Sequence, residues 1–310
     1  MDTPLPPLPA TAPDLPPAAE RFTARDGLVE DRLTGLLWPR DAAAIPYPLA
    51  WTQALDAVAG LNAASHLGRS DWRLPNRREL RSLVDHAAAR PCLPAGHPFA
   101  NVFAGWTWTS TTSAMAPAYA WRVHLAGGRL FYGRKDDPGL AWPVAGPSLV
   151  LPATGQHACF GPDGSALACA GTGQDGELRH GAAWPEPRFA DQGPGVLDRL
   201  TGLTWSRDAD PLGRLLPWDE AEQAVSRLDD GGWRLPSINE LESLVDAAAH
   251  SPALPAGHPF ANVREAYWSA TESGYEAGWA FCLYLHKGAV GVGHMPGPEF
   301  SAWPVRARPA

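Results

Sequence analysis

The sequence predicts an α+β protein built from two copies of one domain. Three observations support this prediction: a long internal repeat, two helical stripes in each copy, and Thr- and Trp-rich stretches that alternate like antiparallel strands. The chain has 310 residues, of which 45% are hydrophobic, so it is long enough to fill two cores. The composition therefore excludes disorder as the main state of the chain.

The internal repeat is the clearest of these signals. Leu33–Trp38 returns as Leu200–Trp205, and Leu93–Val102 recurs unchanged as Leu254–Val263. The register difference falls from 167 to 161 residues between these matches, so the second copy lacks six residues. We place this deletion between its first helix and the Trp-Arg-Leu-Pro step at Trp233. A period near 160 residues is too long for a solenoid unit and fits two whole domains.

The repeat divides the chain into four segments. They are a Pro-rich arm (1–20), a first domain (21–146), a Gly- and Pro-rich connector (147–187) and a second domain (188–310). The arm is acidic and lacks the basic start and apolar middle of a secretory leader. No stretch approaches the roughly 18 apolar residues that a membrane span needs. We therefore expect a soluble chain with no visible export signal.

Each copy is predicted to contain two helices. Trp51 and Trp218 each begin a stripe of apolar residues at helical spacing, after an opening hairpin. The second helix of each copy begins at a capping-box pair, in which two side chains satisfy otherwise unpaired backbone N–H groups. The pairs are Asn76 with Glu79 and Ser237 with Glu240.

Antiparallel strands are expected after the second helix. In the first copy they cover Trp106–Thr112, Tyr119–Leu125 and the run 128–132, with counterparts in the second. The period of two within Tyr119–Leu125 sends Trp121 and Arg122 to opposite faces of the sheet. One face is therefore expected to pack against the core, and the other to be available.

The connector carries a candidate disulfide. Cys159 and Cys169 flank Pro162-Asp163-Gly164, a turn signal that would fold the two flanking segments against each other. Closing so short a loop would stabilise the connector by about 2–3 kcal/mol. The alternative is a pair of free thiols in a cytosolic protein. The other two cysteines, Cys92 and Cys282, have no counterparts in the opposite copy and are expected to be buried single thiols.

An ordered set of motifs resembles one bacterial family. These motifs are Asp31–Trp38, Asp71–Pro75 with Glu79-Leu80, Trp108–Thr111, Ala120–Val123 and Trp142–Val144, with their second-copy partners. The chain looks like two copies of the C-terminal domain of the Legionella collagen-like adhesin, and the connector is similar to a segment that often leads this domain. The resemblance implies C-type-lectin-like domains, each with two helices packed on a small twisted antiparallel sheet.

The same resemblance implies binding outside the cytoplasm. The expected location is extracellular, on the cell surface or periplasmic, and sulfated glycans are a known ligand class of the family. The resemblance does not identify a ligand for this chain, because the scaffold serves many unrelated recognition tasks.

Metal and catalytic chemistry have little support in the sequence. Sugar-binding lectins use Glu-Pro-Asn or Gln-Pro-Asp with Trp-Asn-Asp, because Ca²⁺ takes about six to eight oxygen ligands. Neither triplet is present, so we expect no metal and no other cofactor. The Trp72–Pro75 step followed by Glu79 is similar to that of formylglycine-generating and sulfoxide-synthase enzymes. The reactive Cys pair or His set of those enzymes is missing, so we expect no catalytic residues and no enzyme.

The ten tryptophans that recur in both copies are expected to be structural, because both copies need them whatever they bind. Recognition should then depend on residues that the copies do not share. Aromatic and Arg side chains at sheet positions anchor many binding faces, although a solvated sheet edge is the alternative for any single one. The candidates are Trp106, Trp121, Arg122, His124, Arg129, Tyr132, Arg134, Lys135, Glu272, Tyr275 and His286.

The two copies have opposite charge. Residues 21–146 contain 14 basic and 10 acidic residues, whereas residues 188–310 contain 10 and 16. This charge asymmetry has three possible explanations. It would steer an anionic ligand to the first copy, or it would bring the copies together within or between chains. The third explanation is sequence drift of solvent-exposed residues after the duplication. Much of the difference lies on the second helix, where Arg77, Arg78 and Arg81 stand in place of Ile238, Asn239 and Glu242.

These observations lead to one hypothesis and one alternative. The hypothesis is a non-enzymatic, adhesin-like recognition protein that binds a glycan, sulfated glycans included, or a protein through an aromatic and Arg-bearing strand-and-loop face. The alternative is an accessory or structural subunit of a larger surface or membrane-associated assembly or oligomer, with the Pro-rich arm extended along a partner. The net charge of −8 disfavours nucleic acid as a partner.

Overall fold

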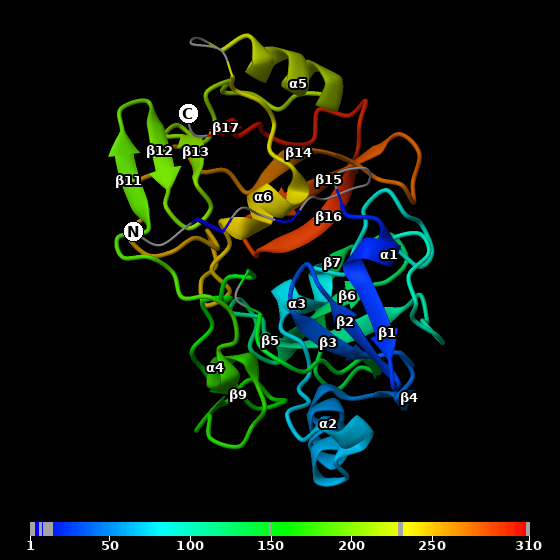
Figure 1. Ribbon diagram of the computed structural model, residues 1–310. Helices are drawn as coiled ribbons and strands as arrows, with labels where there is room; N and C mark the ends of the chain where they lie inside the picture. Colours follow the sequence, from blue (N-terminus) through cyan, green and yellow to red (C-terminus); the bar gives the residue numbers. More distant parts are fainter. Residues whose placement is uncertain (1–3, 6–7, 9–14, 149, 229–231, 308–310) are drawn as a thin grey trace.

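The computed structural model describes residues 4–5, 8, 15–148, 150–228 and 232–307 (Figure 1). Most of the Pro-rich arm, and with it the prediction of an extended conformation, lies outside the described residues. Two described residues of the arm contact the second domain, since Leu5 N donates to Leu200 O at 2.6 Å and Asn239 Nδ2 donates to Leu8 O at 3.1 Å.

The first domain, copy one, opens with a short helix and a three-stranded antiparallel sheet. These are α1 (Ala18–Arg21), β1 (Phe22–Arg25), β2 (Leu28–Asp31) and β3 (Leu36–Pro39). An edge strand, two helices and a 3-10 turn follow, namely β4 (Ile45–Leu49), α2 (Trp51–Ala63), η1 (His66–Gly68) and α3 (Arg77–Arg81). The remaining strands are β5 (Trp106–Thr112), β6 (Tyr119–His124), β7 (Leu130–Arg134) and β8 (Gly139–Ala141).

The connector and the second domain, copy two, contain the remaining elements. The connector contains β9 (Cys159–Phe160), β10 (Ala166–Leu167) and α4 (Asp175–Leu178). Copy two contains β11 (Phe189–Gln192), β12 (Gly195–Asp198), β13 (Leu203–Ser206), α5 (Trp218–Ser226), α6 (Ile238–Ser243), β14 (Ala266–Glu272), β15 (Trp279–Tyr284), β16 (Ala289–His294) and β17 (Val305–Ala307). Its first helix is shorter than that of copy one, with 9 residues against 13, so four of the six missing residues come from the end of the helix and not from the segment after it, where the deletion was predicted.

The two copies share one sheet. Eight strands run in the order β14-β15-β16-β7-β6-β5-β8-β4, and the copies meet where β16 pairs antiparallel with β7 (Figure 1). Val123 pairs with Leu130 inside copy one as Leu283 pairs with Val290 inside copy two, so Leu130 and Val290 are equivalent positions. Because the joint pairs Leu130 with Val290, the copies are related by a local two-fold axis at this point.

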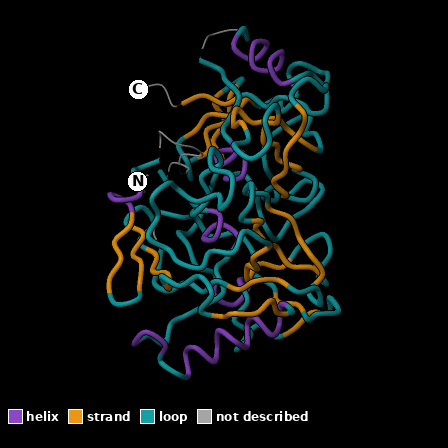
Figure 2. Tube along the Cα trace, turned by 90° about the vertical axis from the view of Figure 1, so that its right-hand side faces the viewer, coloured by secondary structure: helices purple, strands orange, loops and turns teal. Residues whose placement is uncertain are grey.

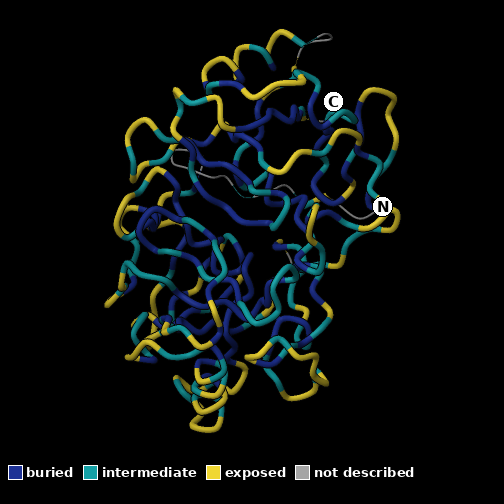
Figure 3. Tube along the Cα trace, turned by 180° about the vertical axis from the view of Figure 1, so that it is seen from behind, coloured by how far each residue is buried: buried dark blue, intermediate teal, exposed yellow. Residues whose placement is uncertain are grey.

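The helices cover the sheet on both sides. On one face, α3 and α6 lie near the middle of the molecule; on the other, α2 and α5 lie at its opposite ends (Figures 1 and 2). One hydrophobic cluster extends through both copies, and two smaller clusters lie beneath α2 and α5. Buried chain fills the middle of the molecule and exposed residues gather at its ends and in its outer loops (Figure 3).

The repeated tryptophans are scaffolding, as predicted. Nine of the ten are buried, and the tenth, Trp233, is half-buried. The geometry also repeats, because the rings of Trp38 and Trp142 lie 5.5 Å apart at 62°, and those of Trp205 and Trp303 have the same separation and angle. The duplicated indoles therefore specify the core of each copy.

The local predictions are mostly confirmed. Asn76 and Ser237 each form the predicted capping box. The strand expected over 128–132 instead covers Leu130–Arg134. Gly127 and Gly128 have φ values of 80° and 67°, so they form the turn before this strand rather than its first residues.

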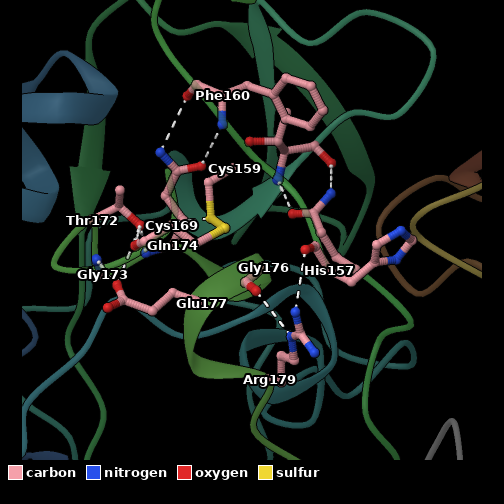
Figure 4. The surroundings of a disulfide bond; sticks show 12 residues. His157, Cys159, Phe160, Cys169, Thr172, Gly173, Gln174, Gly176, Glu177 and Arg179 are labelled. Carbon is pink, nitrogen blue, oxygen red and sulfur yellow. Dashed lines mark hydrogen bonds between the residues drawn. A yellow bond between two sulfur atoms is a disulfide. The ribbon is translucent and has the colours of Figure 1, made fainter. Parts of the chain in front are cut away.

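The predicted disulfide joins Cys159 and Cys169 (Figure 4). It lies at the base of the β9–β10 hairpin, where Cys159 pairs with Leu167. The other two cysteines, Cys92 and Cys282, are buried free thiols, as expected.

Candidate binding face

The face of the shared sheet that carries α2 and α5 also has a half-buried stripe of aromatic rings and cationic side chains. Because α2 packs on β4, β5 and β8, and α5 packs on β14, these helices occupy the ends of the sheet. The stripe lies between them and crosses the joint between the copies. We call it the seam face, and its residues are Trp106, Arg122, His124, Phe131, Tyr284 and Lys287, all of intermediate exposure.

The centre of the copy-one half is a guanidinium held between rings. The Arg122 Cζ lies 4.9 Å from the Trp106 ring centroid and 5.4 Å from that of Trp108. A Cβ at Gly133 would lie 2.3 Å from the same carbon, so glycine lets the arginine lie flat on the sheet. Its Nε is buried and has no hydrogen-bond partner among the described residues. Burial lowers the pKa of Arg122, but it remains a cation, and its Nη2 lies 4.0 Å from the Asp137 carboxylate.

A second pair of rings, one from each copy, lies beside a cation from copy two. The rings of Phe131 and Tyr284 lie 5.9 Å apart across the joint. The Lys287 Nζ lies 5.2 Å from the first ring centroid and 5.0 Å from the second. Phe131 faces Arg122 directly across the β6–β7 pair, which makes the stripe continuous from one copy to the other.

The seam face continues into a cleft of about 560 Å³ in copy two, lined in part by Tyr284 and His286. Asp210 on its wall is buried; its Oδ2 accepts a hydrogen bond from Arg264 Nε at 2.8 Å. Its Oδ1 has no partner within the described part of the chain. The equivalent cleft in copy one is smaller, about 240 Å³, and has Phe103 at the position of Arg264. The two clefts therefore differ in both size and polarity.

Four of the candidates predicted from sequence lie on or beside the seam face. Trp106 and His124 pack against each other with ring centroids 4.7 Å apart, next to Arg122. His286 lies at the mouth of the cleft, 6.2 Å from the Tyr284 ring. Phe131, Tyr284 and Lys287 were absent from the candidates. The strand alternation that exposes Arg122 also applies to Phe131 and Tyr284, but only the pairing of β7 with β16 brings these residues together.

Two candidates are buried, which corrects the expectation that they lie on an accessible face. Trp121 packs beneath α3, with the Arg77 guanidinium 4.4 Å from its ring centroid. Lys135 donates from Nζ to Phe160 O at 2.9 Å, and it lies 4.1 Å from the Trp51 ring centroid. Burial lowers the pKa of Lys135 to about 7. Trp121 belongs to the core because it alternates with Arg122, and Lys135 attaches the connector to copy one.

Two further candidates contact the other copy away from the seam face. Arg129 forms an ion pair with Glu276 across the joint between the copies. Tyr275 is exposed and its ring lies against Gly127, where an added Cβ would come within 3.0 Å. Both side chains therefore contribute to the contact between the copies.

The last three candidates lie apart from these groups. Tyr132 lies on the opposite face of the sheet, with its ring 5.3 Å from that of Trp121. Arg134 is exposed and makes two hydrogen bonds of 2.9 Å to the Asp136 carboxylate. Glu272 is exposed at the end of β14.

The basic second helix is buried between the copies. Arg77, Arg78 and Arg81 on α3 lie around Glu242 on α6, and all four side chains are buried. Of the three explanations for the charge asymmetry, the structure therefore supports contact between the two copies within one chain. These arginines are not on a surface that could steer a ligand.

Across residues 15–148, 150–228 and 232–307 and the described part of the arm, no cluster of three or more His, Cys, Asp or Glu side chains could hold a metal ion. None of the helices described has the length and apolar character of a membrane span.

The fold and the seam face define a class of protein in which two copies of one small α+β domain are fused through a shared sheet. The sequence profile of the Lcl C-terminal domain family matches residues 27–145 and again 195–306, so this chain belongs to that family and carries its domain twice. The match confirms the resemblance described above. No curated protein and no solved structure is significantly similar to the chain.

Proposed function

We propose that this chain is a non-enzymatic, adhesin-like recognition protein that binds a glycan through the seam face. The observation that carries the proposal is the half-buried Arg122 guanidinium, which lies over the rings of Trp106 and Trp108 and has the Asp137 carboxylate no closer than 4.0 Å. Flat rings stack on sugar rings, and a guanidinium pairs bidentately with carboxylate or sulfate groups. Lys287 adds a second cation, so the face favours an acidic glycan over a neutral one.

We also propose that each copy has a C-type-lectin-like fold. The support is the packing of two helices of each copy on a mainly antiparallel sheet, in which β5 and β8 form a parallel pair, together with membership of the Lcl C-terminal domain family. The proposed location is extracellular, on the cell surface or periplasmic. The disulfide between Cys159 and Cys169 favours these places, because disulfides persist in oxidising compartments.

Binding to immobilised heparin and to its desulfated form tests the proposal. We expect binding to the sulfated form to weaken as salt rises, and Arg122→Gln and Lys287→Gln each to reduce its affinity by about tenfold. Arg134→Gln is the matched control, because Arg134 is exposed but lies outside the seam face. Unfolding temperature is measured for every variant, so that a loss of fold is not mistaken for a loss of binding.

Two outcomes contradict the proposal. If Arg134→Gln weakens binding as much as Arg122→Gln does, the interaction is a general charge effect. If neither glycan binds and a protein co-purifies with the chain from its native source, the alternative of a structural subunit in a larger assembly is favoured.

A further inference from the structure

Between the copies, three buried guanidiniums share one carboxylate. Arg77 Nε lies 3.2 Å from Glu242 Oε1. Arg81 Nη1 and Arg78 Nε lie 3.6 and 3.9 Å from Oε2 of the same carboxylate. All four side chains are at least nine-tenths buried, so water screens them little. The cluster has an excess of positive charge.

The surrounding charges do not balance this excess. Arg188 lies near Arg78, but it makes two hydrogen bonds of its own to Asp198, at 3.0 and 2.8 Å. Asp246 attracts Arg78 from longer range, while its Oδ1 accepts a hydrogen bond from Ala248 N. Burial lowers the pKa of Arg77 to about 10 and lowers the pKa values of Arg78 and Arg81 as well. Burial opposes the charge on all three guanidiniums.

The donors are only partly used. Arg78 Nη2 donates to Val245 O at 2.7 Å, and Arg81 Nη2 donates to Asn239 Oδ1 at 3.0 Å. The Nε and Nη1 of Arg78 and the Nε of Arg81 are buried without a hydrogen-bond partner in the described structure. A buried N–H group without an acceptor is costly, more so when the group is charged.

A cavity of about 50 Å³ adjoins these two arginines. Its wall also includes Glu242 from α6 and Leu8 from the arm. On this measure a single water molecule needs about 10–15 Å³, so the space has room for a small inorganic ion. Glu242 repels an anion here, but three cations around it outweigh one carboxylate.

We propose that this cavity binds a single inorganic anion of the size of chloride. The anion accepts hydrogen bonds from the unused N–H groups of Arg78 and Arg81 and offsets part of the buried positive charge. Since α3 belongs to copy one and α6 to copy two, the bound ion stabilises the contact between the copies. This site is separate from the seam face and does not depend on the proposed glycan binding.

Thermal unfolding of the full chain in two salts tests the site. Sodium chloride is compared with sodium gluconate at the same ionic strength, because gluconate is a much larger anion than chloride. We expect a saturable rise in Tm with chloride of roughly 2–5 °C per tenfold increase above the dissociation constant. Arg81→Met should abolish the chloride-specific rise, whereas Arg134→Met, which removes an exposed arginine, should leave it intact.

Diffraction from crystals grown in sodium bromide gives a second readout that does not depend on a variant folding. The expected result is an anomalous peak within hydrogen-bond distance of the Arg78 and Arg81 guanidiniums. A Tm that is equal in the two salts at every concentration, or a cavity with no bromide peak, overturns the proposal.

Discussion

Arg77 in copy one lies 3.2 Å from Glu242 in copy two, and both side chains are buried. Glu242 occupies the position equivalent to Arg81, 161 residues earlier, so the two-fold relation between the copies is broken in charge at their contact. Two identical basic helices would repel each other there. The opposite charges of these two helices thus have a structural reason: a basic α3 and an acidic residue on α6 attract each other where the copies pack together.

Replacing Glu242 with Gln should destabilise the protein by about 3–5 kcal/mol, because three buried guanidiniums would then lack a carboxylate. Urea unfolding measures the change. Glu222→Gln removes an exposed carboxylate on α5 and should have little effect. A decrease in the free energy of unfolding of less than about 0.5 kcal/mol for Glu242→Gln would mean that Glu242 does not offset repulsion among the three arginines.

Two buried tryptophans should differ in their response to substitution by Phe. Trp51 Nε1 donates to Thr109 O at 2.7 Å, whereas Trp38 Nε1 has no partner among the described residues. Trp51→Phe should therefore cost about 1–2 kcal/mol more than Trp38→Phe, because it leaves the Thr109 carbonyl unpaired. Chemical denaturation of both variants gives the difference.

Copy two offers an internal repeat of that comparison. Trp218 Nε1 donates to Ser269 O at 2.7 Å, and Trp205 Nε1 lacks a partner in the described structure. The same order of stabilities is expected for the variants of this pair. Equal costs within both pairs would contradict the argument from hydrogen bonding.

Placing an alanine at Gly133 should disturb the seam face without breaking the strand. The new Cβ would come within 2.3 Å of the Arg122 Cζ, so the guanidinium must leave the tryptophan rings. Affinity for the sulfated glycan should fall by about tenfold, as for Arg122→Gln. Gly60→Ala, on the exposed side of α2 where a Cβ meets nothing within 4 Å, is the control and should stabilise the helix slightly. Unchanged binding by the Gly133 variant would exclude Arg122 from the ligand site.

Asp175 should make stability depend on pH. Thr111 Oγ1 and Thr154 Oγ1 each donate to its Oδ2 at 2.7 Å, and burial raises its pKa from 3.8 to about 6. The folded chain therefore holds a proton here between pH 4 and 6 that the unfolded chain has lost. Its contribution to stability is complete below pH 3.8 and is lost as the pH rises through 6.

Asp175→Asn keeps the site neutral at every pH and isolates this contribution. The stability of the variant relative to the wild type should increase by about 2–3 kcal/mol between pH 4 and 6 and then stay constant. Denaturation at a series of pH values measures the difference, with Glu222→Gln as an exposed control. A difference that is flat across this range would show that Asp175 is ionised in the fold.

Opening the disulfide should loosen the connector and spare the domains. Replacing Cys159 and Cys169 with Ser should remove about 2–3 kcal/mol of local stability. Hydrogen exchange should quicken in the β9–β10 hairpin while the amides of β5 and β6 keep their protection. A reductant should reproduce the effect in the wild type and do nothing further to the double Ser variant. Faster exchange throughout the sheet would instead make the connector part of the cooperative core.

Much of each copy could be predicted from sequence because it depends on local pattern. The capping box at Asn76 requires two residues three positions apart, and the strand Trp106–Thr112 is marked by its own composition. The turn between Cys159 and Cys169 brings two nearby cysteines together, so the disulfide could also be predicted from the sequence. The tryptophans were identifiable as core because they occur twice.

The tertiary structure alone decided how the copies meet and where a ligand could bind. The pairing of Leu130 with Val290 joins residues 160 positions apart, and no periodicity within either strand specifies it. That pairing creates the seam face from Arg122 and Tyr284. It also buries Arg77 beside Glu242. From the sequence, contact between the copies was only one of three explanations for their opposite charges. Residue spacing dictates elements, but burial and partnership depend on which faces of distant elements pack together.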